Sequence, residues 1–255
     1  MTDAPVALIT GAADGIGFAI ASRMAQAGCR VVIADLDAAT AATKAASLGP
    51  EHLGLAMDVT SETAVEDGIA AAIARFGRLD IAVCNAGIGD THLPSLEQDI
   101  ASFDQVLRVH LNGTFLVARA AARQMIGQGR GAILTVSSIA GITGLPRRNA
   151  YGAAKAGIAA MTKAMACEWG PQHVRVNAIA PGYTRTALVA KLIDAGRIDE
   201  AKLRRRTPMG RLADPAEIAE AAWFLCSPAA SFITGAVLSV DGGWAAFGDA
   251  GDAHI

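Results

Sequence analysis

The sequence has few cysteines, little net charge and no cluster of metal-ligand spacing. Its 255 residues include 4 cysteines and carry a formal net charge of −2. The cysteines at positions 29, 84, 167 and 226 show neither C-x-x-C nor zinc-site spacing, so we expect buried or half-buried free thiols and no metal. The balanced charge gives no support for a nucleic-acid or anionic-membrane partner.

Long hydrophobic segments are missing as well. No apolar run approaches the roughly 20 residues that a membrane-spanning helix needs. The N-terminal residues lack the basic segment of a secretory signal and run directly into a strand pattern. Together with unpaired cysteines, these features predict a cytoplasmic protein without a membrane partner. Because repeats, linkers and shifts in composition are also absent, we expect a single domain over residues 1–255.

Short apolar runs alternate along the chain with longer helical patterns. Such runs are typical of strands that are buried on both faces of a parallel sheet. The predicted strands are Val6–Thr10, Arg30–Asp35, Leu53–Met57, Ile81–Cys84, Ala132–Val136, Val174–Ala180 and Val237–Val240. The predicted helices are Phe18–Ala27, Ser61–Phe76, Ser102–Met125, Tyr151–Trp169 and Pro215–Cys226. This alternation predicts an α/β fold.

A glycine-rich turn follows the first predicted strand. Gly11, Gly15 and Gly17 have the spacing G-x-x-x-G-x-G, at a place where backbone N–H groups and a helix N-terminus can receive a pyrophosphate. A tight turn without a ligand is the alternative, because the commoner fingerprint is G-x-G-x-x-G. Asp35 ends the second strand, where a carboxylate accepts hydrogen bonds from ribose hydroxyls and repels a 2′-phosphate, which favours NAD over NADP.

Polar and small residues follow the other predicted strands at their C-terminal ends. They are Asp58, Asn85-Ala86-Gly87, Ser138 and Pro181-Gly182. Ligands of open parallel sheets bind at this edge, so we expect these residues to surround one site.

Tyr151 and Lys155 stand four residues apart in a predicted helix, on one face. A free phenol has a pKa of about 10, and a neighbouring ammonium group favours the phenolate, so we expect the Tyr151 pKa to be lowered. Tyr151 could then exchange a proton with an alcohol, while Ser138 offers its hydroxyl to the same oxygen. The alternative is a pair of solvent-exposed side chains on the helix surface.

These residues together resemble the short-chain dehydrogenase/reductase family, in its compact form of about 250 residues. The resemblance extends from Val6 to Trp244. It is carried by Thr10-Gly11-x-x-x-Gly15-Ile16-Gly17, Asp58-Val59, Asn85-Ala86-Gly87, Asn112, Ser138, Tyr151-x-x-x-Lys155 and Pro181-Gly182. The resemblance implies a Rossmann-like, doubly wound parallel sheet of seven strands in the order 3-2-1-4-5-6-7.

The resemblance also implies an oxidoreductase that uses NAD to interconvert a secondary alcohol and its ketone. Tyr151 would be the acid/base, Lys155 would lower its pKa and hold the nicotinamide ribose, and Ser138 would polarise the substrate oxygen. Asn112 would support a proton relay through water to Lys155. The implied cofactor-binding residues are Gly11, Asp14, Gly15, Ile16, Gly17, Asp35, Asp58, Val59, Asn85, Ala86, Gly87, Tyr151, Lys155, Pro181, Gly182, Thr184 and Thr186. A homotetramer or homodimer, paired through the two long helices, is also implied.

The substrate is left open by the sequence. A polyol, sugar or hydroxy acid is favoured, and residues 187–209 are predicted to form a mobile lid. Arg147 or Arg148 could meet a substrate carboxylate or phosphate, although solvated loop arginines are the more common outcome. Reduction of a 3-oxoacyl group on a carrier protein is the alternative, with Arg119 and Arg123 as its basic patch. A non-catalytic dinucleotide sensor would be expected to lack Tyr151 or Lys155, and an isomerase or dehydratase would call for a longer substrate domain.

Overall fold

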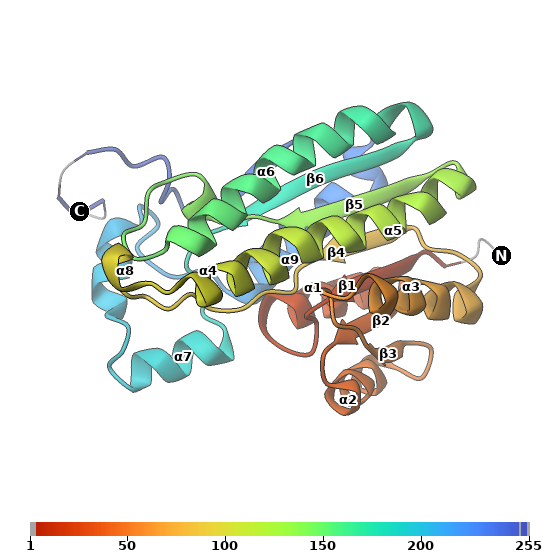
Figure 1. Ribbon diagram of the computed structural model, residues 1–255, viewed down its shortest axis with the longest axis horizontal. Coiled ribbons are helices and arrows are strands. Elements are labelled where there is room, and N and C mark those ends of the chain that lie inside the picture. Colours follow the sequence, from red (N-terminus) through yellow and green to blue (C-terminus); the bar gives the residue numbers. More distant parts are fainter. Residues whose placement is uncertain (1–3, 250, 254–255) are drawn as a thin grey trace.

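Seven parallel strands form the centre of the molecule in the computed structural model, which describes residues 4–249 and 251–253. The strands are β1 Val6–Thr10, β2 Arg30–Asp35, β3 Leu53–Ala56, β4 Ile81–Cys84, β5 Gly131–Val136, β6 Val174–Pro181 and β7 Val237–Val240. They are arranged in the order β3-β2-β1-β4-β5-β6-β7 (Figure 1). Both the fold class and the strand order predicted from the sequence are confirmed.

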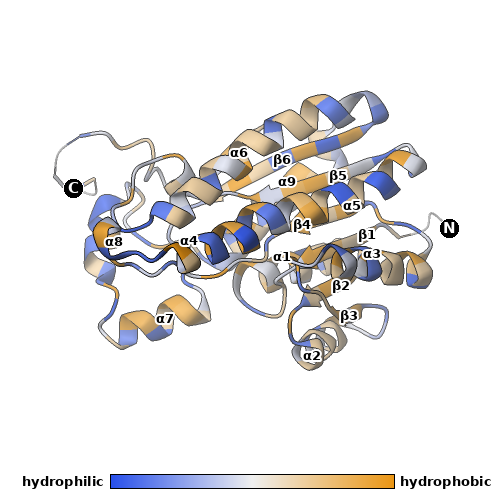
Figure 2. Ribbon diagram, in the orientation of Figure 1, coloured by the Kyte–Doolittle hydropathy of each residue, from blue (hydrophilic) through white to orange (hydrophobic). Residues whose placement is uncertain are grey.

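Helices cover both faces of this sheet. One face is packed by α1 Gly15–Gln26, α2 Ala38–Leu48 and α9 Pro215–Cys226, and the other by α3 Glu62–Phe76, α5 Gly113–Gln128 and α6 Asn149–Trp169. Each layer seals its own apolar cluster against the strands, of which β4 is largely hydrophobic in Figure 2. Because β1 and β4 are buried on both faces, they have continuous apolar sequences rather than alternating ones.

The long helix predicted over residues 102–125 is interrupted. The chain forms α4 Ile100–Leu107, then one π-helical turn at Arg108–Asn112, and then α5. Gly113, the residue after this π-helical turn, packs closely against Val59, since a Cβ atom at Gly113 would lie 2.8 Å from Val59 Cγ2. A π-helical turn inserts extra chain into the helix and changes which side chains face the sheet.

The segment predicted as a lid, residues 187–209, contains two helices that were not predicted. They are α7 Ala187–Asp194 and α8 Glu200–Arg206, which lie beyond the end of the sheet at which the strands terminate (Figure 1). Neither helix contains a buried residue, yet α7 is largely hydrophobic in Figure 2. Short 3₁₀ turns occur at Ser95–Glu97, Ile139–Gly141, Gly170–Gln172 and Pro228–Ala230.

The cysteines differ in exposure. Cys29, Cys84 and Cys226 are buried and Cys167 is exposed, all four as free thiols. The expectation of burial is therefore wrong for Cys167, which lies on the solvent side of α6. Among the described residues, no helix is both long and apolar enough to cross a bilayer.

Candidate active site

A cavity of about 660 Å³ follows the edge of the sheet at which the strands end. Its floor is the point where β1 and β4 are neighbours although they are not consecutive in sequence, the position at which open α/β sheets bind ligands. The two loops touch there, since a Cβ atom on Gly11 would lie 2.7 Å from Ala86 Cα. Only a residue without a side chain fits this approach.

Most of the predicted site residues line this cavity. They are Gly11, Asp14, Ile16, Asp35, Asp58, Val59, Asn85, Ala86, Gly87, Ser138, Tyr151, Lys155, Pro181, Gly182, Thr184 and Thr186. Gly15, Gly17 and Asn112 do not line it. The fold thus gathers residues from six separate loops, while their individual roles stay predictions.

Tyr151 and Lys155 lie one turn apart near the start of α6. The Lys155 Nζ atom is 5.4 Å from the centre of the Tyr151 ring and donates a hydrogen bond of 2.7 Å to the Val136 carbonyl oxygen. Lys155 is only 4% exposed, and burial lowers its pKa to about 7. Lys155 therefore gains or loses its proton within the neutral pH range, instead of staying fully charged there.

The Tyr151 phenol does not have the lowered pKa that we expected. Burial raises the Tyr151 pKa, and a hydrogen bond from the Ser138 side chain and the charge of Arg148 oppose this effect. The prediction is wrong because the phenol is buried, and because Arg148, rather than the desolvated Lys155, is the cation that acts on it. Ser138 follows β5, and its hydroxyl oxygen accepts a hydrogen bond of 3.1 Å from Ala140 N. Its hydroxyl proton therefore remains free to be donated to Tyr151 or to a substrate oxygen.

Asn112 is exposed and does not line the cavity. It therefore lies outside the site, and its predicted part in a proton relay to Lys155 stays a prediction. The cause of this position is the π-helical turn at Arg108–Asn112, which a regular 3.6-residue reading of the segment does not include. His110, two residues earlier, lines the cavity instead.

His110 was not identified from the sequence, where it is a single histidine between Val109 and Leu111. Its ring is 3% exposed and stands edge-on to the Tyr151 ring, with centroids 5.1 Å apart. His110 Nε2 lies 3.1 Å from Ile88 N and 2.8 Å from Ile88 O. His110 Nδ1 is buried without a hydrogen-bond partner among the described residues. Burial and, secondarily, the charge of Lys155 lower the His110 pKa to about 4.

The glycine turn is fixed from two sides. Asp14 caps α1 by accepting a hydrogen bond of 2.7 Å from Gly15 N. The Asn85 amide donates to Thr10 O at 2.9 Å and to Gly11 O at 3.0 Å. Gly17 lies under this amide, because a Cβ atom there would be 2.5 Å from Asn85 Nδ2. Gly15 and Gly17 therefore shape the turn, and the N-terminus of α1 beside it could hold a pyrophosphate.

Acidic residues line the far end of the cavity. Asp35 accepts hydrogen bonds from Ala13 N at 3.0 Å and Leu36 N at 2.8 Å, which leaves further lone pairs on its carboxylate for a ligand. Asp58 Oδ1 accepts from the backbone and the side chain of Thr60. Leu36, next to Asp35, is 72% exposed. This end could hold an adenosine, with ribose hydroxyls at Asp35.

The loop after β6 closes the cavity on the opposite side. Gly182 approaches β7, since a Cβ atom there would lie 2.8 Å from Asp241 Cα. Thr184 Oγ1 donates to Gly182 O at 3.2 Å, and Thr186 caps α7 through Val189 N at 3.3 Å. Thr184 has therefore committed its hydroxyl proton to the backbone, whereas Thr186 accepts and keeps its hydroxyl proton for a ligand.

The two loop arginines have different positions. Arg147 is exposed and adopts φ +66°, and it does not line the cavity. Arg148 is half-buried, lines the cavity, and places its Cζ atom 5.5 Å from the centre of the Tyr151 ring. His92 is near Arg148, whose charge together with burial lowers the His92 pKa. Only one of the two arginines is therefore at the site.

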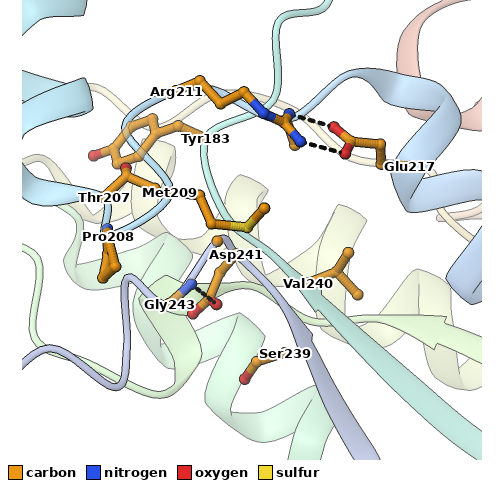
Figure 3. Close-up of a pocket in the computed structure, with 12 residues that line it drawn as sticks. Tyr183, Thr207, Pro208, Met209, Arg211, Glu217, Ser239, Val240, Asp241 and Gly243 are labelled. Carbon is orange, nitrogen blue, oxygen red and sulfur yellow. Dashed lines mark hydrogen bonds and ion pairs between the residues drawn. The ribbon is translucent and has the colours of Figure 1, made fainter. Parts of the chain in front are cut away.

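A second cavity of about 510 Å³ shares Tyr183 with the first (Figure 3). Its charged side chains are matched to partners. Arg211 donates to both carboxylate oxygens of Glu217, each at 2.6 Å, and Asp241 Oδ1 accepts from Gly243 N at 3.0 Å. The polar groups near Tyr151 that lack such partners among the described residues, His110 Nδ1 and the Arg148 guanidinium group, thus belong to the first cavity.

No group of three or more potential metal ligands occurs in residues 4–249 and 251–253. The residues that line the first cavity instead suit an extended, phosphate-containing ligand. It would pass from Asp35, across the glycine turn, to Tyr151 and Lys155.

Comparison with known proteins gives the same outline. A family model described as enoyl-(acyl carrier protein) reductase matches residues 11–245. A short-chain type dehydrogenase/reductase of Sinorhizobium fredii is 43% identical over 98% of this chain, although this chain spans only 45% of that protein. A cis-4-hydroxycyclohexanecarboxylate dehydrogenase of Sinomonas cyclohexanicum is 44% identical, over 94% of this chain and 96% of the relative. A D-threitol dehydrogenase of Mycolicibacterium smegmatis is 43% identical, over 95% and 93%.

Solved structures agree with these sequence relatives. A 3-ketoacyl-(acyl-carrier-protein) reductase of Brucella melitensis, solved as a complex with NADH, superposes with a TM-score of 0.87. It is 38% identical, and the match covers 94% of this chain and 98% of that one.

Proposed function

The chain belongs to the short-chain dehydrogenase/reductase family, and from this premise we propose that it uses NAD to interconvert a secondary alcohol and its ketone. Relatives named as dehydrogenases of a hydroxy acid and of polyols make it an oxidoreductase acting on CH–OH groups. The observation that carries the proposal is the Tyr151 phenol inside the cavity, with Ser138 and Lys155 beside it. A polyol, sugar or hydroxy acid is the proposed substrate.

The mechanism assigns the proton to Tyr151. A nicotinamide cofactor, which Asp35, the glycine turn and Lys155 would hold, would supply the acceptor or donor for the hydride of the carbinol carbon. Tyr151 takes the hydroxyl proton as that hydride leaves, and Ser138 donates a hydrogen bond to the same oxygen. Because burial raises the Tyr151 pKa, the ammonium form of Lys155 and a positively charged cofactor would both be needed to favour the phenolate.

His110 takes the relay position that the sequence analysis gave to Asn112. Its Nε2 atom is satisfied by Ile88 in either tautomer, as donor to the carbonyl or as acceptor from the amide. The free Nδ1 atom can therefore accept or donate one hydrogen bond without loosening the ring. A water held there would connect the Lys155 region to solvent and return the proton to the site.

A panel of secondary alcohols with NAD⁺ and NADP⁺, followed by near-ultraviolet absorbance of the reduced cofactor, tests the overall proposal. We expect turnover with NAD⁺. Tyr151→Phe should lower kcat at least about 100-fold, the usual size of a general acid–base contribution, while NADH still binds. Substantial residual turnover in this variant would count against Tyr151.

Replacing His110 tests the relay. His110→Phe should lower kcat about 10- to 100-fold, whereas His110→Asn, which keeps a donor and an acceptor, should recover most of that loss. Asn112→Ala is the matched control and should leave kcat and its pH profile unchanged. A loss in the Asn112 variant equal to that in His110→Phe would return the role to Asn112.

The preference for NAD is assigned to Asp35. The residues lining its end of the cavity include the acids Asp14, Asp35 and Asp58, which would repel a 2′-phosphate. Asp35→Ala should therefore reduce the ratio of kcat/KM for NAD⁺ over NADP⁺. An unchanged ratio would place the discrimination elsewhere.

Reduction of a carrier-bound 3-oxoacyl group is the less favoured function. It requires an unpaired basic patch for an acidic carrier protein. Arg119 pairs with Glu62, and Arg123 pairs with Glu66 at 3.0 Å. The patch considered in the sequence is therefore largely neutralised by α3.

A further inference from the structure

Arg148 brings a positive charge into the substrate end of the cavity. Among the described arginines, it is the one that lines this cavity. Its Cζ atom lies 5.5 Å from the centre of the Tyr151 ring, and Arg148 is the residue that directly precedes α6. A substrate oxygen at the Tyr151 hydroxyl would therefore have a guanidinium group near it.

This guanidinium group has no carboxylate partner in the described part of the chain. Arg211, by contrast, holds Glu217 in a bidentate contact (Figure 3), and Arg185 holds Glu200 at 2.7 Å. Arg147 and Arg197 have no carboxylate partner among the described residues either, but neither of them lines the cavity. The Asp90 carboxylate, whose charge opposes the burial that lowers the pKa of the nearby His92, is bonded to backbone N–H groups and forms no ion pair with Arg148. Its two oxygens accept hydrogen bonds from Tyr151 N at 3.1 Å and Thr91 N at 2.7 Å.

Two neutral side chains accompany Arg148. Its charge acts on Tyr183, whose pKa burial raises, so that phenol keeps its proton and can donate a hydrogen bond. It also acts on His92, whose pKa is lowered by burial first and then by Arg148 and Arg197. His92 has a left-handed backbone, with φ +62°, which is uncommon outside glycine. The loop thus holds a neutral imidazole beside the cation.

We propose that Arg148 binds a carboxylate of the substrate, so that the alcohol oxidised at Tyr151 belongs to a hydroxy acid. The inference rests on the proposed function and narrows its substrate class. A guanidinium fork matches the two oxygens of a carboxylate. Arg148 is the one described arginine that lines the cavity, and a single guanidinium group balances a single negative charge, which favours a carboxylate over the dianion of a phosphate ester.

A second reading of the same geometry has a different consequence. Arg148 could act only on Tyr151 by favouring the phenolate. In that case its removal would slow every alcohol alike and would move the pH profile of kcat/KM to higher pH. A carboxylate-binding role instead changes the preference between an acid and a neutral compound of the same shape.

The experiment compares hydroxy acids with their own amides. Substrates are 2-, 3- and 4-hydroxy acids, the corresponding amides, and glycerol phosphate, each with NAD⁺. The wild type should prefer the best acid over its amide. Arg148→Gln should lower the acid-to-amide ratio of kcat/KM about 10- to 100-fold, mainly through KM, as for the loss of a hydrogen-bonded charge. Arg148→Lys should retain part of the ratio.

Arg147→Gln is the matched control, because Arg147 is adjacent and exposed but outside the cavity. It should leave the ratio as in the wild type. An unchanged ratio in Arg148→Gln, or a wild type that prefers amides, overturns the inference while leaving the dehydrogenase assignment intact. A preference for glycerol phosphate overturns the assignment to a carboxylate. If no alcohol is oxidised, the proposed function fails. Calorimetry of the acids with the NADH complex then decides the inference separately: binding that is lost in Arg148→Gln supports it, and binding that is unchanged overturns it.

Discussion

Lys155 is a residue that the fold tolerates at a cost. It is 4% exposed, and its one hydrogen bond in the described structure joins Nζ to the Val136 carbonyl oxygen. A buried ammonium group loses its hydration and is stabilised only in part by a single neutral acceptor. Functional sites commonly break such packing rules, and the position is therefore expected to lower stability.

The free energy of unfolding that is lost by burying Lys155 should be larger at low pH than at high pH. Burial lowers the Lys155 pKa from 10.5 to about 7, so the unfolded chain binds a proton that the folded protein binds less well. The penalty is absent above about pH 10.5, grows as the pH falls, and is complete below about pH 7. Lys155→Met should raise the free energy of unfolding by about 2–4 kcal/mol at pH 7, allowing for the lost hydrogen bond.

Urea denaturation at pH 7 and pH 10 measures this effect. The gain in Lys155→Met should shrink at the higher pH, and the variant should have lost turnover. Lys163→Met, an exposed site on the same helix, is the control and should change stability by less than about 0.5 kcal/mol. A Lys155→Met protein less stable than the wild type at pH 7 would show that the ammonium group stabilises the fold.

Side chains at the site were predictable where they end a strand. Asp35, Ser138 and Tyr151 could be placed because strand ends and the first turn of a helix fix position almost directly. His110 could not, because the π-helical turn that brings it inward depends on packing around Gly113 rather than on local sequence. The Tyr151 pKa was also out of reach, since it depends on burial and on Arg148.

Some helices and strands could likewise be predicted from the sequence, and others could not. Strands β1, β2, β4 and β7 have the predicted bounds, because each is a mainly apolar run ended by glycine or polar residues. Helices α7 and α8 were missed because they are short, with 8 and 7 residues, and bury no residue. Residues 187–209, which remain a proposed lid, are thus the part of the chain with the weakest sequence signal.

The glycine turn is an element whose shape can be tested directly. In Gly17→Ala, the new Cβ atom would lie 2.5 Å from Asn85 Nδ2 and closer still to Gly11 O. Relief of this clash requires the amide to release the turn. We expect a loss of about 1–3 kcal/mol of stability and NADH binding weakened at least about 10-fold, measured by thermal unfolding and calorimetry.

Gly28→Ala provides the comparison. Gly28 also has a left-handed backbone, with φ +86°, but a Cβ atom there meets nothing within 4 Å. The substitution should cost about 1 kcal/mol of stability through backbone strain and leave NADH affinity unaltered. Equal losses of NADH affinity in the two variants would mean that the effect is general and does not come from the turn.

Apolar side chains remain exposed on two separate surfaces of the molecule. The edge surface comprises Phe224 on α9, Phe232 in the following turn and Leu238 on β7, which are 42%, 102% and 38% exposed. The helix surface comprises Phe115 and Ile126 on α5, which are 40% and 37% exposed. β7 is the last strand of the sheet, so its outer edge is also unpaired among the described strands. Both features favour association with another copy.

Two different self-complementary surfaces on one chain generate a tetramer with D2 symmetry, and either surface alone generates a dimer. We therefore expect the wild type to be a tetramer by size-exclusion chromatography with light scattering. Phe232→Asp and Phe115→Asp should each give dimers, and the double variant should give monomers, because a carboxylate cannot be buried unpaired in either contact. Leu96→Asp, at a leucine that is 101% exposed outside both surfaces, should keep the wild-type mass. A monomeric wild type would exclude both surfaces as contacts, and a tetramer that survives the double variant would place the contacts on other residues.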